Sequence, residues 1–178
     1  MPIEDLTKNE YADIKAETET MYDADQNSIK RALANNGVYE DDNKALVASN
    51  TNRMREIVEK IRWPTISKVG ESVSNMAWLL VQHADHDVEF QKMALELMKA
   101  VAPGDVSKRN IAYLEDRVRV NADQPQLYGT QFSGETRETY EPKPIEDPER
   151  VDERRKEMGM ETLGEYRDIL LKKYFLNK

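Results

Sequence analysis

Cysteine is absent from this chain of 178 residues, and glycine and proline each occur only seven times. Without cysteine the protein has no disulfide, no thiolate nucleophile and no sulfur ligand for zinc. The longest apolar run, residues 76–81, is far shorter than the roughly 20 residues of a membrane-spanning helix. The polar, acidic start of the sequence does not resemble a secretory signal. We therefore expect a soluble cytoplasmic protein without membrane segments.

The charge balance argues against a further class of partner. Acidic residues outnumber basic ones by 34 to 26, which gives a net charge of -8. Nucleic-acid binders need clustered cationic side chains, and the aromatic residues of this chain do not alternate with a basic stripe. We expect no nucleic-acid partner. The 39% of hydrophobic and 34% of charged residues instead indicate amphipathic elements with solvated outer faces.

Segments of helical periodicity fill most of the chain, and the few glycines and prolines lie between them. The spacing of apolar residues predicts helices over residues 3–21, 25–35, 42–61, 67–84, 88–101, 105–120, 148–159 and 163–175. Asp85 or Asp87 is suited to cap the fifth of these helices, because an aspartate oxygen accepts hydrogen bonds from the first amide groups. The chain length suits one domain. The prediction is a mainly α, single-domain helical bundle over residues 1–178.

Helical periodicity fails over residues 121–147. Here "QLYGTQFSGETRETY" alternates around Ser133 and Gly134, which predicts an irregular loop or a short β-hairpin. Pro142 and Pro144 then favour an extended segment, because proline fixes its own backbone and lacks an N–H group. The helical bundle is therefore expected to carry one non-helical insertion.

The stretch "LLVQHADHD", residues 79–87, contains the two histidines of the chain. His83 follows Leu79 and Leu80 by four and three residues, so on a helix it shares their buried face. It is either a general acid or base, or a core histidine bonded to a carbonyl or a carboxylate. His86 and its flanking aspartates suggest a divalent-metal site, but the spacing lacks the paired histidines of zincin-type helices. A helix corner with a solvent-facing His86 is the preferred interpretation.

Further polar candidates flank the predicted helix over residues 105–120 and follow it. Asp116 and Arg117 lie beside the apolar stripe of that helix, where a carboxylate can orient an imidazole and a guanidinium can hold an anion. The alternative for Arg117 is an internal ion pair.

The "QLYGTQ" stretch, residues 126–131 and hereafter the QLYGTQ loop, presents amide and phenol groups around Gly129. Such neutral groups can orient a polar small molecule, and a glycine permits unusual dihedrals or a close approach by a ligand. The alternative is that Gln126, Tyr128 and Gln131 fasten the loop onto the helices.

Five sequence fragments, in this order and spacing, resemble a bacterial family, the domain-of-unknown-function family 6624. They are "WPTISKVG", "AWLLVQHAD", "YLEDRV", "QLYGTQ" and "PIEDPERVDERRKEMGM". The likeness covers roughly the last two thirds of the chain, and Asp25-Gln26 and "NTNRMREIVEK" extend it weakly towards the N-terminus. It implies a common fold and a shared polar site, and it brings no established activity. One departure is Arg62, because relatives typically have glycine before the Trp-Pro pair.

Arg154 and Arg155 are adjacent, so on a helix they point about 100 degrees apart and only one faces inward. The resembling family has its arginine at the second position of this pair. The resemblance therefore implies that Arg155 is the inward residue.

Three functions remain open. In an acid–base enzyme, a hydrolase or lyase acting on a polar or anionic small molecule, His83 is the general acid or base and Asp116 orients it. The groups assigned to the substrate are Arg117, Gln126, Tyr128, Gln131 and Arg155. In a noncatalytic binding or interaction module, the same side chains form a buried hydrogen-bond network. A metal-dependent enzyme requires His83 or His86 and two carboxylates around one ion. The sequence does not specify which cofactor, if any, is bound, nor the oligomeric state.

Overall fold

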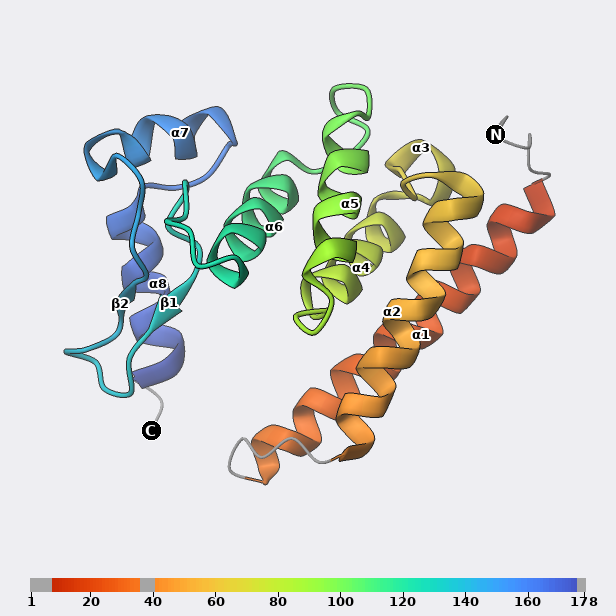
Figure 1. The fold of residues 1–178 in the computed structure, drawn as a ribbon, viewed down its shortest axis with the longest axis horizontal. Coiled ribbons are helices and arrows are strands. Elements are labelled where there is room, and N and C mark those ends of the chain that lie inside the picture. The colour runs from red at the N-terminus through yellow and green to blue at the C-terminus, as the bar shows by residue number, and fades with distance from the viewer. Residues whose placement is uncertain (1–7, 36–40, 176–178) are drawn as a thin grey trace. The chain divides into compact units, whose positions relative to one another are not determined.

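A computed structural model describes residues 8–35 and 41–175 of the chain. The structure is 69% helical, with one small two-stranded sheet in the described residues, which confirms the mainly α class. The chain forms two compact units, unit 1 (Met1–Ser107) and unit 2 (Lys108–Lys178) (Figure 1). Over the described ranges, none of the helices combines the length and the apolar character needed to cross a bilayer.

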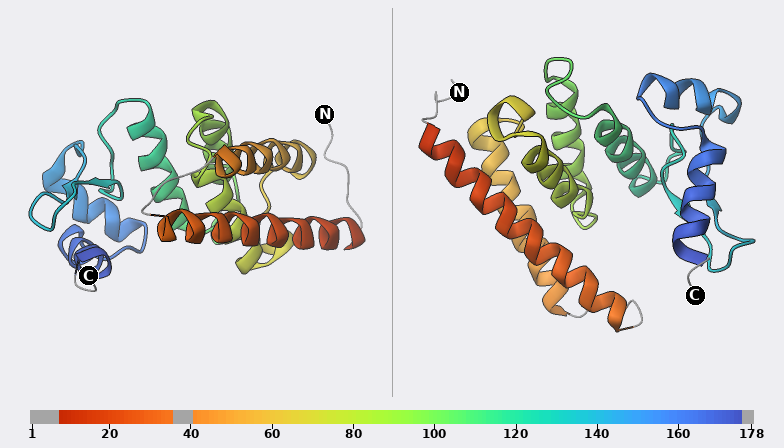
Figure 2. Two further views of the ribbon diagram at one scale, coloured as in Figure 1. Left: turned by 90° about the horizontal axis from the view of Figure 1, so that it is seen from below. Right: turned by 180° about the vertical axis from the view of Figure 1, so that it is seen from behind.

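Unit 1 is built from helices. They are α1 (Lys8–Ala34), α2 (Asp41–Ile61), α3 (Ile66–Val69), α4 (Glu71–Gln82) and α5 (Val88–Lys99). The first two, α1 and α2, lie side by side and run antiparallel, as both views in Figure 2 show. Helix α4 packs against both of them and against α5. Its apolar residues and those of α2 and α5 form the core, in which Met54, Trp63, Ala77, Val81 and Phe90 are at most 1% exposed.

The seam between α1 and α2 changes character along its length. Its buried residues follow each other at intervals of mostly three, four or seven, the spacing of helices that pack along a shared line. The buried residues of the two helices are Ile14, Thr18, Asp25, Ser28 and Ala32 in α1, and Asn43, Asn50, Thr51, Met54, Ile57, Val58 and Ile61 in α2. One end of the seam is apolar, and the other end contains four polar residues, hereafter the polar seam: Asp25, Ser28, Asn43 and Asn50.

Two predicted helix boundaries in unit 1 were wrong. The helices predicted over residues 8–21 and 25–35 are one continuous helix, because no glycine or proline interrupts the residues between them. The beginning of the first prediction, residues 3–7, lies outside the described residues. Conversely, the helix predicted over residues 67–84 is split at Gly70, whose φ of 85° ends α3 before α4 begins.

Unit 2 combines helices with the irregular insertion. Its elements are α6 (Lys108–Asn121), β1 (Phe132–Ser133), β2 (Glu141–Pro142), a 3-10 turn η1 (Pro148–Arg150), α7 (Val151–Glu157) and α8 (Leu163–Phe175). Strands β1 and β2 pair antiparallel, with Phe132 opposite Pro142, which confirms a short hairpin within the insertion. The predicted position of its turn was wrong, because Ser133 lies in β1 and residues 134–140 connect the two strands. Three rings from α6, β1 and α8 meet edge to face, with centroids of Tyr113 and Phe132 at 6.1 and 5.7 Å from that of Tyr166. Aromatic packing thus joins the hairpin to the helices.

Arg62 has a backbone conformation that glycine adopts more easily than residues with a side chain. Its φ is 61°, in the left-handed region, and its side chain is exposed. For a residue with a Cβ atom, this conformation costs roughly 1–2 kcal/mol of folding free energy. Glycine avoids this cost, but it also raises the conformational entropy of the unfolded chain, which offsets part of the gain. The turn before Trp63 therefore persists without glycine, at the expense of stability.

We expect Arg62→Gly to raise the free energy of unfolding by up to about 1 kcal/mol. Urea unfolding monitored by circular dichroism measures the change. Arg62→Ala is the matched control, since it removes the same side chain and keeps the Cβ atom. A glycine variant less stable than the alanine variant would contradict the explanation.

Candidate functional site

His83 and Asp25 form a hydrogen-bonded pair in unit 1. His83 is the cap residue at the C-terminal end of α4, and Asp25 belongs to the buried face of α1. The imidazole Nδ1 lies 2.9 and 3.1 Å from the two carboxylate oxygens. The Asp25 side chain is 3% exposed, whereas the His83 side chain is 25% exposed. The pair therefore joins a buried carboxylate to an imidazole that remains partly open.

Two glutamines hold the members of this pair in place. Gln26 donates from Nε2 to the Asp25 carboxylate at 3.0 Å. Gln91 of α5 is fully buried, and its Nε2 lies 3.2 and 3.3 Å from the carbonyl oxygens of the two residues before His83. The last carbonyl groups of a helix have no partner within the helix. Gln91 therefore fixes the backbone segment that carries the imidazole.

The hydrogen bond defines which nitrogen of His83 is available. A charged carboxylate only accepts hydrogen bonds, so the imidazole Nδ1 carries the hydrogen. In the neutral ring, Nε2 then keeps a lone pair and can take a proton from a reacting group. A carboxylate on Nδ1 orients the ring and stabilises its charged form. The pair thus has the chemistry of a general base that later acts as a general acid.

The corner between α4 and α5 is a capped turn. Asp87 accepts a hydrogen bond from the Phe90 amide at 3.0 Å and pairs with Arg55, which confirms Asp87 as the cap. Burial acts to raise the pKa of Asp87, but the Phe90 amide and the Arg55 guanidinium outweigh it and lower that pKa. His86 and Asp85 are exposed. Within residues 8–35 and 41–175, no three histidine or carboxylate side chains are grouped so that they could hold a metal ion.

Asp116 in α6 binds the backbone of the QLYGTQ loop. The residue is fully buried, and its carboxylate accepts from the amide groups of Leu127, Tyr128 and Thr130 at 2.7, 3.0 and 2.8 Å. Burial raises the pKa of Asp116, and these three amide groups oppose the rise because they stabilise the charged carboxylate. The side chain thus supplies acceptors to a segment that lacks a regular hydrogen-bond ladder.

Gln126 and Gln131 bind each other and their surroundings. The fully buried Gln126 donates from Nε2 to the carbonyl oxygens of Gln131 and Lys143 at 2.9 and 2.8 Å, and its Oε1 accepts from the Gln131 amide at 2.8 Å. The Gln131 side chain accepts from Nη1 of Arg117 at 2.9 Å. The two carboxamides and Arg117 therefore all have partners within the protein.

Arg155 is the inward residue of the arginine pair, with 0% exposure, which confirms the prediction drawn from the family resemblance. It donates to the carbonyl oxygens of Glu161 and Tyr128, both at 2.6 Å, and its guanidinium lies 4.9 Å from the centre of the Tyr166 ring. Burial lowers the pKa of Arg155, and the Glu161 carboxylate opposes this change. Arg154 also donates to the QLYGTQ loop, from Nε to a carbonyl oxygen at 2.8 Å.

Gly129 is required in this loop for two reasons. Its φ is 68°, and a Cβ atom there would lie 2.7 Å from a methyl group of Leu163 and 3.0 Å from one of Ile145. The close approach anticipated at this glycine is therefore made by side chains of the protein itself.

The structure gathers six of the seven candidates around the QLYGTQ loop of unit 2. They are Asp116, Arg117, Gln126, Tyr128, Gln131 and Arg155. Tyr128 takes part through its backbone N–H and C=O groups. His83 belongs to unit 1, where Asp25 fills the orienting position that the sequence analysis gave to Asp116.

Sequence reasoning assigned neither Asp25, which it named only as part of the family resemblance, nor Gln91 to the candidate site. Each is a polar residue within a stripe of buried positions, Asp25 eleven residues after Ile14 and Gln91 beside Phe90. A polar side chain at such a position requires a buried partner, which was a usable signal. The identity of the partner was not readable, because it comes from another helix.

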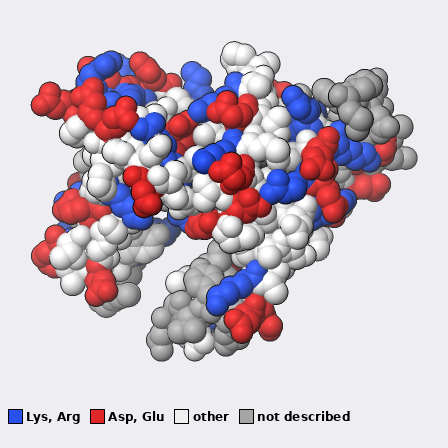
Figure 3. Space-filling model, viewed as in Figure 1, with Lys and Arg blue, Asp and Glu red and all other residues white. Residues whose placement is uncertain are grey.

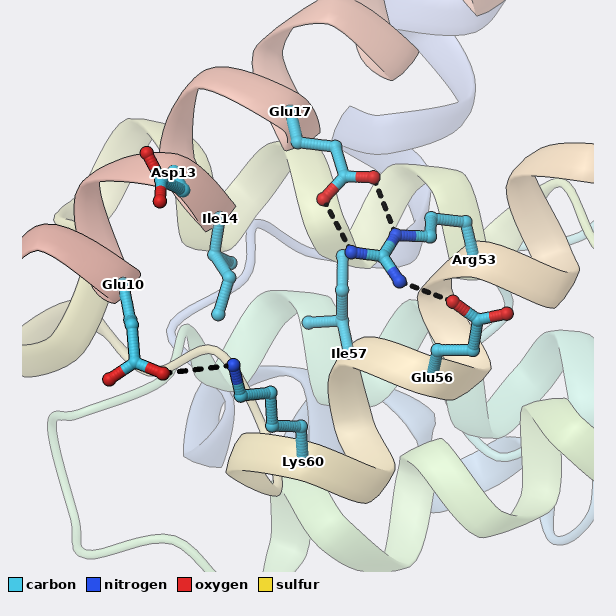
Figure 4. A pocket seen from close by; sticks show the side chains of 8 residues that line it. All are labelled: Glu10, Asp13, Ile14, Glu17, Arg53, Glu56, Ile57 and Lys60. Atoms are coloured by element: carbon cyan, nitrogen blue, oxygen red, sulfur yellow. Dashed lines mark hydrogen bonds and ion pairs between the residues drawn. The ribbon is translucent and has the colours of Figure 1, made fainter. Parts of the chain in front are cut away.

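A pocket opens on the surface between α1 and α2 (Figure 4). It is lined by Glu10, Asp13, Ile14, Glu17, Arg53, Glu56, Ile57 and Lys60. Its arginine is bonded to two of the glutamates and its lysine to a third. Similar mixtures of acidic and basic side chains cover the face of the molecule in Figure 3. The pocket is therefore a groove bridged by ion pairs and contains neither member of the His83–Asp25 pair.

Comparison with protein families places this geometry in context. The model of a family of unknown function, DUF6624, matches residues 12–178, which include Asp25, His83 and the QLYGTQ loop. The chain belongs to this family. No curated protein and no solved structure matches the chain.

We expect His83 to be the Nδ1–H tautomer when it is neutral, because Asp25 accepts only at that nitrogen. Nitrogen-15 NMR of the imidazole rings measures this, and the exposed His86 is an internal reference in the same spectrum. Asp25→Asn should weaken the preference, since an amide can either donate or accept. A predominant Nε2–H form of His83 in the unaltered protein would refute the hydrogen bond.

We expect Asp116→Ala to lower the free energy of unfolding by roughly 3–5 kcal/mol, because it leaves up to three loop amide groups without their acceptor. Chemical denaturation measures the loss. Asp168→Ala, at an exposed position of α8, is the control and should stay within about 0.5 kcal/mol of the parent protein. If both variants were equally stable, the anchoring function of Asp116 would be excluded.

Proposed function

We propose that the protein is an acid–base enzyme, a hydrolase or lyase that acts on a polar or anionic small molecule. The observation that carries this proposal is the bond between the buried Asp25 carboxylate and Nδ1 of the partly exposed His83. This bond leaves Nε2 as the reactive atom. In the proposed reaction, His83 removes a proton from the substrate or from an attacking water and later returns it to the leaving group.

Asp25 is proposed to orient the imidazole and to stabilise its charged form during proton transfer. Its burial supports this, because a charge–charge interaction is stronger where water is excluded. Gln26 and Gln91 are proposed as positioning residues, the first for the carboxylate and the second for the backbone of His83.

A second candidate function, a noncatalytic binding or interaction module, is favoured by the contacts in unit 2. There Asp116, Gln126 and Arg155 are fully buried and bond to backbone groups of the protein. Such a network stabilises the QLYGTQ loop, whether or not a ligand binds. This candidate requires no reaction at His83.

A cell extract tests the two candidates directly. The purified protein is incubated with the small-molecule fraction of a bacterial lysate, and mass spectrometry records which compounds disappear. We expect at least one compound to be consumed by the unaltered protein and by His86→Ala, and roughly 10²–10⁴ times more slowly by His83→Ala. Asp25→Asn should also be slow.

Thermal unfolding of each variant controls for loss of fold. If folded His83→Ala changed the extract in the same way as the unaltered protein, or if neither changed it, the enzyme proposal would be rejected. The binding module would then be the better explanation.

A further inference from the structure

His83 follows the last residue of α4, at the corner that joins α4 to α5. Its backbone N–H group still bonds to the Leu79 carbonyl oxygen, but the last carbonyl groups of a helix find no donor within that helix. The position of the imidazole therefore depends on groups outside α4. Asp25 bonds to the ring itself, and contacts from α2 and α5 hold the backbone that carries it.

Arg55 of α2 contacts the beginning of α5 at two points. Its Nη2 donates to the carboxylate of Asp87, the residue that caps α5, and its guanidinium lies 4.7 Å from the centre of the Phe90 ring. Phe90 is fully buried. A guanidinium held by both a carboxylate and a ring face is more restrained than one in an ordinary surface ion pair. Arg55 therefore fixes where α5 begins relative to α2.

The first turn of α5 carries Gln91, which reaches back to α4. The backbone N–H of Gln91 donates to the Asp87 carbonyl oxygen at 3.1 Å, so the two residues lie one helical turn apart on the same face. The Gln91 side chain bonds to the carbonyl oxygens of the two residues before His83. The Asp87 amide donates to the Ala84 carbonyl oxygen at 2.9 Å. A change in the position of Asp87 therefore moves the backbone on both sides of His83.

Helix α2 also packs against the helix that carries Asp25. Helices α1 and α2 are in contact along their seam, and Asp25 lies on the buried face of α1. The imidazole is thus connected to α2 through Arg55 and α5, whereas its carboxylate partner is connected to α2 through the seam. Because a hydrogen bond requires both a short distance and a suitable direction, the bond between His83 and Asp25 depends on both connections.

Arg53, two residues earlier in α2, provides a matched comparison. It bonds to Glu17 of α1 and to Glu56 of α2, and its side chain is 44% exposed. Neither of these partners belongs to α4 or α5. The two arginines therefore share residue type, helix and ion pairing, and they differ in whether a partner belongs to the corner that carries His83.

We propose that Arg55 is a positioning residue for His83 and acts through Asp87 and the first turn of α5. It keeps the imidazole in line with Asp25, so that Nδ1 stays bonded to the carboxylate and Nε2 keeps its lone pair. In this role Arg55 touches neither the substrate nor the imidazole. The inference rests on the proposed function and extends the set of positioning residues from α1 and α5 to α2.

Two substitutions remove the contact in different ways. Arg55→Gln removes the charge, and Asp87→Asn removes the ion pair but keeps a residue that caps helices well. We expect either change to lower kcat for the His83-dependent consumption of a compound roughly tenfold and to leave KM unchanged, because a misplaced catalytic group slows the chemical step. A dilution series of the small-molecule fraction of a bacterial lysate separates kcat from KM.

Three further variants test the route of the effect. The double variant Arg55→Gln/Asp87→Asn should be no slower than either single variant, since both remove the same contact. Arg55→Lys keeps the charge opposite Asp87 and should restore part of kcat. Arg53→Gln is the matched control and should have the kcat of the unaltered protein.

Nitrogen-15 NMR of the imidazole tests the positioning without any substrate. In Arg55→Gln and in Asp87→Asn, the neutral His83 ring should shift from the Nδ1–H tautomer towards the Nε2–H tautomer, because its bond to Asp25 is loosened. In Arg53→Gln it should keep the Nδ1–H form. Thermal unfolding shows whether each variant is folded.

The two measurements separate this inference from the proposed function. A folded Arg55→Gln variant with the kcat of the unaltered protein would overturn the inference and leave His83 as the acid–base residue. A lower Tm with the tautomer unchanged would also overturn it, because the ion pair would then be purely structural. If the unaltered protein consumed no compound, the acid–base proposal would fail, and the tautomer alone would decide whether Arg55 positions the imidazole.

Discussion

The hydrogen bond between Asp25 and His83 links two helices across 58 residues of sequence. A buried carboxylate is costly unless it is paired, so the position of α1 against α4 and the orientation of the imidazole depend on the same contact. Further polar groups surround this bond. Gln26 donates to the Asp25 carboxylate, and Gln91 donates to the backbone just before His83. The other residues of the polar seam are buried polar side chains of the same two helices, α1 and α2.

In unit 2, buried charged side chains bond to the backbone of the QLYGTQ loop. This loop has no helical ladder to satisfy its backbone groups, which must nevertheless be paired because they are buried. Asp116 from α6 supplies acceptors, and Arg155 from α7 supplies donors. Most polar atoms that look suited to binding a substrate are thereby bonded within the chain itself, whereas Nη2 of Arg155 is buried without a hydrogen-bond partner. Aspartate, glutamine and arginine can bind a ligand or hold a loop in place, and only the partners seen in the structure show which of the two they do.

The helical content was predictable because apolar periodicity reports it directly, and α2, α5 and α8 begin within one residue of the sequence prediction. The errors at α1 and Gly70 arose where periodicity was loose or where one glycine outweighed an apolar stripe. Of the candidate site, His83 and the cluster around the QLYGTQ loop were identified from residue type and resemblance. The partner of His83 was not, because Asp116 and Asp25 are chemically equivalent and only their positions in space differ.

By itself, the sequence determined the mainly α class, the cysteine-free chemistry, the family and the residues with functional potential. These properties depend on composition and on spacing between neighbours along one chain segment. The tertiary structure decided which carboxylate meets the imidazole and which donors of Arg117 and Arg155 bond to other parts of the chain. Those facts depend on how separate helices pack, and local spacing does not encode which distant segment supplies a given partner.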